Sequence, residues 1–275
     1  MHRQLGISSA MLGQQLTREN LAAAAAAGVE VLEVYVPAGG ELYEQDAAVE
    51  CLGEMTHEMG LGVWSVHAPF GGNVDVSSLD ELQRRASVDA AARAAAVARV
   101  LGARFVVVHA GLSAEDGEER QLRWRESLRS INSLIKRCAQ LGVRVTIEYL
   151  PANKLRLCND SGHILEFLSV CDGDPGICLD TNHANLAEPL AQAVRTLGSR
   201  IETLHISDND GEQERHEMPG NGVIDWAEFA ALLDEIGYTG PLMYETGGAE
   251  NVAELMATTA ANAREYFGWE GPAGE

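Results

Sequence analysis

Histidines and carboxylates recur along this chain at the ends of short apolar runs. The set comprises His67, His109, Glu148, Asp180, His183, His205 and Glu245. Imidazole and carboxylate groups are the usual protein ligands of divalent metals, although any single one could instead be a hydrogen-bonded core residue. Several carboxylates that converge on one place repel one another unless a cation lies between them. The repetition over six runs therefore predicts a shared metal site.

The residues between His205 and Glu245 extend this set. A polar, glycine-containing loop follows the apolar run Ile201–Ile206 and carries Glu214, Arg215 and His216. A carboxylate, a guanidinium and an imidazole in one loop can complete a metal site or contact a polar substrate. The alternative is that they are loop side chains facing water.

The elements that would position these residues alternate regularly between strand and helix. β-branched, apolar runs predict strands at Leu5–Ser9, Val29–Val36, Gly62–Phe70, Arg104–Gly111, Val143–Pro151, Gly176–Ala184, Ile201–Ile206 and Pro241–Glu245. Alanine-rich or amphipathic stretches predict helices at 17–28, 43–60, 79–101, 115–141, 161–172, 225–236 and 250–267, with one more between the sixth and seventh strands and a frayed tail over 268–275.

Eight such pairs predict an α/β fold, a (β/α)8 TIM barrel forming a single domain over residues 1–275. A doubly wound open sheet is the rival, but no GxGxxG follows the first strand. Because barrel active sites form at the carboxyl ends of the strands, the ligand-type residues would converge there. Glu33 lies inside a predicted strand, where a buried charge needs a partner.

Composition narrows the class of function. The chain has 275 residues and a net charge of −21, which argues against nucleic acid as a partner. No apolar run is long enough to span a membrane, and the N-terminus lacks a signal-peptide pattern, so we expect a cytoplasmic protein. The five cysteines include no CxxC pair, which favours free thiols. The oligomeric state stays open, homo-oligomers included.

The motifs together resemble the xylose-isomerase-like barrel superfamily, which holds sugar isomerases and epimerases and the zinc-dependent abasic-site endonucleases. The matching stretches occur in the family's order: Val66-His67-Ala-Pro-Phe, Val108-His109-Ala-Gly, Ile147-Glu148, Leu179-Asp180-Thr-Asn-His183-Ala, His205-Ile-Ser-Asp208-Asn, His216-Glu-Met-Pro-Gly-Asn-Gly-Val-Ile-Asp225-Trp and Met243-Tyr-Glu245.

The resemblance implies roles for individual residues. In the isomerases and epimerases, one divalent ion (Mn²⁺, Mg²⁺ or Zn²⁺, with no organic cofactor) is held at the positions of Glu148, Asp180, His205 and Glu245. The two glutamates also serve as the catalytic acid/base pair. This implies a sugar or sugar-phosphate isomerase or epimerase that moves a proton next to a carbonyl. His183 and Arg215 would then contact the sugar-like substrate.

The endonuclease branch implies a different activity. That branch holds three zinc ions with additional ligands, which match His67, His109, His183 and His216, with Glu214 in place of an aspartate. A zinc-dependent phosphoesterase is therefore the alternative, and a barrel that binds a small molecule without turnover is a third hypothesis. The acidic and neutral loops at the strand ends favour a small sugar-like substrate over a duplex.

Overall fold

Eight parallel strands form the centre of the molecule. The computed structural model describes residues 3–13, 16–152 and 155–272. Its strands are β1 Leu5–Ser8, β2 Val31–Tyr35, β3 Gly62–His67, β4 Phe105–Val108, β5 Arg144–Glu148, β6 Gly176–Asp180, β7 Ile201–His205 and β8 Leu242–Tyr244. They pair in the order β7-β6-β5-β4-β3-β2-β1-β8, with every pair parallel. All eight predicted strands are present, although several are shorter than expected.

The contact between β7 and β8 nearly closes this sheet into a barrel. The backbone N–H of Ile206 donates to the Met243 carbonyl at 2.8 Å, and that of Glu245 donates to the Ile206 carbonyl at 3.0 Å. These bonds lie just beyond the last residue of β7. They bring His205 and Glu245 side by side at the carboxyl ends of their strands.

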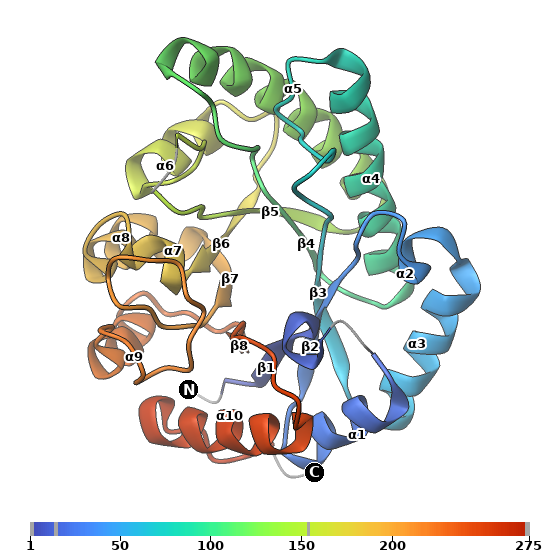
Figure 1. Ribbon diagram of the computed structural model, residues 1–275, viewed down its shortest axis with the longest axis vertical. Helices are drawn as coiled ribbons and strands as arrows, with labels where there is room; N and C mark the ends of the chain where they lie inside the picture. The colour runs from blue at the N-terminus through green and yellow to red at the C-terminus, as the bar shows by residue number, and fades with distance from the viewer. Residues whose placement is uncertain (1–2, 14–15, 153–154, 273–275) are drawn as a thin grey trace.

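Helices surround the barrel on its outside (Figure 1). The helices are α1 Arg18–Ala26, α2 Glu41–Glu44, α3 Asp46–Glu58, α4 Glu81–Val100, α5 Gly117–Leu141, α6 Ser161–Ser169, α7 Thr181–Asn185, α8 Leu190–Leu197, α9 Trp226–Glu235 and α10 Val252–Phe267, with 3-10 turns η1 Ser9–Leu12 and η2 Gly198–Arg200. This arrangement is the predicted single-domain (β/α)8 TIM barrel.

Local sequence explains where the longest helices begin and end. The Asp80 side chain accepts hydrogen bonds from the backbone of Leu82 and Gln83, which caps the start of α4. Most of the alanines of α4 are buried, and their small side chains let this helix pack closely on the strands. Helix α5 ends at Gly142, whose φ of 71° is a left-handed conformation that glycine adopts without strain.

Several expectations about the ends of elements were wrong, including the helix expected over 43–60, which is the two helices α2 and α3. The sixth strand ends at Asp180, and Thr181–Asn185 form α7, so His183 lies on a helix. The helix predicted over 161–172 ends at Ser169. The tail is not simply frayed: Trp269 is buried and stacks on the Arg264 guanidinium, while residues 273–275 lie outside the described part. Within the described residues, no helix is long and apolar enough to cross a membrane.

Candidate metal centre

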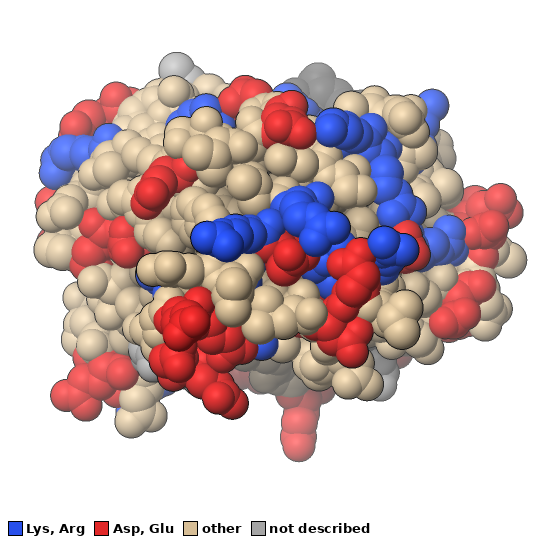
Figure 2. Space-filling view, turned by 90° about the horizontal axis from the view of Figure 1, so that it is seen from above, with Lys and Arg blue, Asp and Glu red and all other residues tan. Residues whose placement is uncertain are grey.

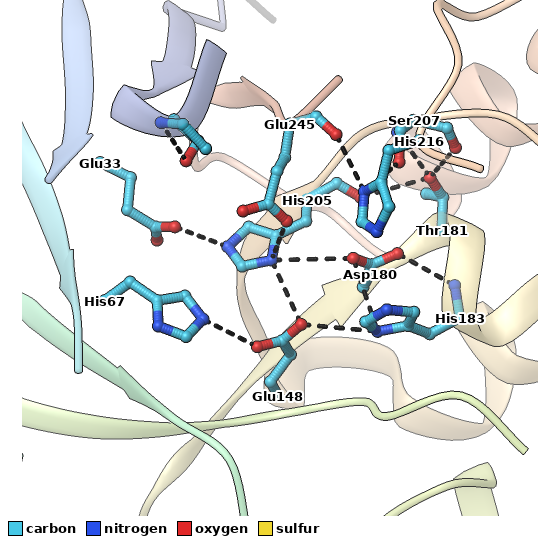
Figure 3. Close-up of polar contacts among 12 residues, drawn as sticks. Glu33, His67, Glu148, Asp180, Thr181, His183, His205, Ser207, His216 and Glu245 are labelled. Carbon is cyan, nitrogen blue, oxygen red and sulfur yellow. Dashed lines mark hydrogen bonds and ion pairs between the residues drawn. The ribbon is translucent and has the colours of Figure 1, made fainter. Parts of the chain in front are cut away.

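Four ligand-type side chains meet at the carboxyl end of the barrel. Glu148, Asp180 and His205 are the last residues of β5, β6 and β7, and Glu245 directly follows β8. One ligand atom from each lies within 4.8 Å of those of the other three. Figure 3 shows Glu148 and Glu245 approaching His205 from opposite sides. The structure thus brings together the four residues predicted to share an ion.

The atoms of this group lie close enough together to be ligands of one cation. His205 Nδ1 lies 3.0 Å from Glu245 Oε2, 3.5 Å from Glu148 Oε1 and 3.8 Å from Asp180 Oδ2. His205 Nδ1 and Asp180 Oδ2 are both buried and make no hydrogen bond. Buried polar atoms without partners are costly and rare, so each such atom needs an explanation. A divalent cation held by these three carboxylates and one imidazole would supply it.

Two further histidines contact the other oxygen of Glu148. His67 Nε2 lies 3.0 Å and His109 Nε2 2.8 Å from Glu148 Oε2. Atoms of these three residues form a second group with metal-ligand spacing, also within 4.8 Å of one another. Phe70 stacks on the His109 ring with the ring centroids 3.9 Å apart, and it is partly exposed. Glu148 is therefore shared by two ligand groups.

Asp180 belongs to a third group, with His183 and His216. Glu214 Oε1 lies 3.5 Å from His183 Nε2 and 3.6 Å from His216 Nε2. His183 Nε2 is buried without a hydrogen-bond partner. The loop residues predicted as additional ligands thus lie beside Asp180, and the adjacent groups share its carboxylate.

Two of the histidine rings, those of His67 and His183, are oriented by main-chain carbonyls. His67 Nδ1 lies 2.8 Å from the Ala68 carbonyl, and His183 Nδ1 lies 2.8 Å from the Tyr149 carbonyl. Because a carbonyl can only accept, each Nδ1 carries the proton and Nε2 faces the site. Metal-binding histidines commonly show this arrangement, in which one nitrogen donates to a fixed acceptor and the other is free for the ion.

The close packing of these groups shifts their pKa values. Burial would raise the pKa of Glu148, but His109, His205 and His67 outweigh it and hold that pKa well below its usual range. Burial raises the pKa of Asp180 despite its histidine neighbours. Burial also opposes ionisation of Glu245, yet His205 lowers its pKa to about 2. Contacts with the histidines therefore stabilise the charged forms of Glu148 and Glu245.

Arg215 does not join these groups. Its guanidinium lies 2.7 Å from Asp210 and 3.5 Å from Glu217, both in the same loop, and its side chain is 44% exposed. The predicted contact between Arg215 and a substrate stays a prediction.

Two buried carboxylates hold parts of the site in place, and the sequence analysis gave neither of them this role. Glu33 of β2 is fully buried and lies 2.8 Å from His205 Nε2. Its signal in the sequence was a charge inside an apolar strand. Asp208 is also fully buried and anchors the loop that carries His216. Its sequence signal, an acidic residue among others in a polar loop, does not distinguish an anchor from a solvated side chain.

The fold is a parallel barrel, and its carboxyl end carries a cluster of histidines and carboxylates that could hold a metal ion. A family model described as xylose isomerase-like TIM barrel matches residues 21–266. The chain belongs to this family.

Relatives include proteins of two activities. An L-ribulose 3-epimerase from Mesorhizobium japonicum is 26% identical over 257 residues, which cover 92% of this chain and 83% of that protein. A probable endonuclease 4 from Mycobacterium leprae is 27% identical over 255 residues, covering 87% and 95%. The solved structure of a D-tagatose 3-epimerase-like protein shares the fold with a TM-score of 0.84 at 23% identity, covering 96% of this chain and 98% of that one.

Proposed function

We propose that this protein is a divalent-metal-dependent epimerase or isomerase of a small sugar or sugar phosphate. The observation that carries the proposal is the placement of Glu148 and Glu245 on opposite sides of one buried group of ligand atoms. Glu148, Asp180, His205 and Glu245 would hold the ion. The similarity to an L-ribulose 3-epimerase over most of the chain supports the same activity class.

The two glutamates suit the transfer of a proton at a carbon next to a carbonyl. One carboxylate removes the proton from one face of the substrate carbon, and the other acid delivers a proton to the opposite face, which inverts the configuration. A bound cation would stabilise the negative charge that develops on the carbonyl oxygen. His67 and His109 fix the orientation of Glu148 through its Oε2 atom.

A second candidate activity is zinc-dependent phosphoester hydrolysis. It is favoured by the two additional ligand groups, His67–His109–Glu148 and Asp180–His183–His216. Histidine-rich sites prefer zinc, and several zinc ions suit the displacement of a phosphate ester. The similarity to a probable endonuclease 4 is consistent with it.

The distribution of positive charge favours the sugar hypothesis. Arginine and lysine side chains gather with acidic ones on the outer face seen from above in Figure 2. On α4 and α5 they pair with carboxylates, as in the contacts of Arg85 with Glu81 and of Arg137 with Asp89. At the barrel mouth, Arg215 pairs with Asp210. Arginine and lysine side chains that are already paired with carboxylates are poorly placed to bind the phosphates of a nucleic acid.

Proton exchange separates the two activities. We expect the enzyme with Mn²⁺ in D₂O to replace a carbon-bound hydrogen of its ketose substrate with deuterium. Proton NMR measures this exchange over a panel of ketoses and ketose phosphates. Glu148→Gln and Glu245→Gln keep side-chain size but remove the proton acceptor, so each should lower the exchange rate about 10²–10⁴-fold. Glu202→Gln is the matched control, because Glu202 lies on β7 and pairs with Arg144, away from the ligand group.

Two other results would change the assignment. Hydrolysis of a phosphodiester, about three zinc ions per chain and no exchange with any sugar would establish the phosphoesterase activity instead. Sugar product without exchange would keep the isomerase class but refute the proton transfer between the two glutamates.

A further inference from the structure

Glu33 connects the opposite side of the barrel to the candidate metal centre. It lies on β2, and its Oε1 atom is 2.8 Å from Nε2 of His205 on β7. Both side chains are fully buried. Figure 3 shows the Glu33 carboxylate on the side of the His205 ring that faces away from Asp180. The contact spans 172 residues of sequence, so only the closed barrel creates it.

The second oxygen of Glu33 is held by a neighbouring strand. The Ser65 hydroxyl donates to Glu33 Oε2 at 2.7 Å. A register irregularity after Leu32 places Ser65 directly opposite Glu33 in the β2–β3 pair. When the Nδ1 atom of His205 binds an ion, the ring proton is on Nε2, which then donates it to Glu33 across the 2.8 Å contact. The Nδ1 atom of His205 is then the nitrogen available to an ion, and it is the atom that faces the three carboxylates.

We propose that Glu33 is a positioning residue that orients His205 as a metal ligand through its Nδ1 atom and strengthens that ligand with a buried negative charge. Carboxylate–histidine–metal arrangements raise the basicity of the imidazole and fix its ring. His67 and His183, in contrast, are oriented by neutral main-chain carbonyls. The contact with Glu33 therefore distinguishes His205 from these two histidines. It makes the His205 ring the most firmly oriented of the three.

The inference rests on the metal centre of the proposed function, and metal affinity tests it without a substrate. The dissociation constants of Mn²⁺ and Zn²⁺ would be measured by competition with a chelator for the wild type and for Glu33→Gln and Glu33→Ala. We expect the affinity to fall about 10-fold for Gln, which keeps a neutral acceptor, and about 100-fold for Ala, which has none. Glu30→Gln is the matched control, because Glu30 lies just before β2, at the other end of the barrel, and contacts the Leu5 backbone; its metal affinity should equal that of the wild type.

A spectroscopic measurement distinguishes orientation from general loss of structure. In the Zn²⁺-loaded wild type, the His205 Nε2–H proton should give a downfield NMR resonance protected from solvent exchange. In Glu33→Ala that resonance should disappear, while thermal unfolding and circular dichroism of the two variants verify that they fold. The Gln variant should keep the resonance, since its carbonyl still accepts the bond.

The outcomes separate this inference from the proposed function. Suppose that the wild type binds metal and both Glu33 variants fold. If their affinities then lie within about twofold of the wild-type value, the role of Glu33 is overturned, and the metal centre is not. Failure of the wild type to bind either ion overturns the metal centre, and the proposed activity with it.

Discussion

Replacing Asp208 with asparagine should destabilise the protein far more than an isosteric change of a loop residue normally does. Each oxygen of this fully buried carboxylate accepts two hydrogen bonds. Oδ1 accepts from the backbone N–H of Asn209 at 2.9 Å and of Ile224 at 3.2 Å. Oδ2 accepts from the Gly220 N–H at 2.9 Å and from Trp226 Nε1 at 2.8 Å.

Asparagine cannot satisfy these four donors in either orientation of its amide. The NH₂ group must face two N–H donors whichever way it points, and a buried donor left unpaired costs about 1–3 kcal/mol. Two of them give an expected loss of about 2–6 kcal/mol, a large share of the roughly 5–15 kcal/mol that stabilises a typical domain. The surroundings leave little space to relax, because a Cβ at Gly222 would lie only 2.3 Å from Asp208 Oδ1.

The free energy of unfolding, measured by urea denaturation, tests this expectation. Asp210→Asn is the control: Asp210 lies two residues away, is partly exposed, and accepts from Glu212, Gln213 and Arg215. Its variant should change the free energy of unfolding far less, because the Asp210 carboxylate is in contact with water, which screens its interactions. If Asp208→Asn lowers the free energy of unfolding by less than about 1 kcal/mol, the view that this carboxylate anchors the loop carrying Glu214 and His216 is refuted.

Two further predictions concern the metal and pH. Removal of bound metal with a chelator should lower the melting temperature, because the repelling carboxylates lose the ion that binds only the folded state; an unchanged melting temperature would exclude a tightly bound native metal. The metal-free protein should also lose stability as the pH rises from about 6.5 to about 9. Burial opposes the charge on His67, but the Glu148 hydrogen bond raises its pKa to about 9. The stabilisation from this charge is therefore fully present at a pH below the pKa of His67 in the unfolded chain. It is lost as the pH rises through the pKa of His67 in the folded protein. His216, with burial offset by Glu214, has its pKa raised to about 9 and acts in the same direction. Urea midpoints of the chelated protein across this range would measure the effect, and a midpoint that rises with pH would contradict it.

The sequence by itself determined the barrel and most of the ligand set. Strands buried on both faces read as continuous apolar runs, and parallel strands of a barrel end on the same side, so the residues that end them must converge. His67, Glu148, His205 and Glu245 could therefore be assigned to one site from local pattern alone.

Only the tertiary structure decided how these residues are connected. The partner of Glu33 lies across the barrel, and its hydrogen bond to His205 follows from strand closure and register, which local propensity does not encode. The short helix that carries His183 begins where the Asp180 side chain accepts a hydrogen bond from the His183 backbone N–H. This N-cap ends the strand at Asp180, although the apolar run before it predicted a longer strand. Trp269 is buried because the chain end packs back on the barrel. Contacts between residues distant in sequence arise from packing, and packing is a property of the whole fold.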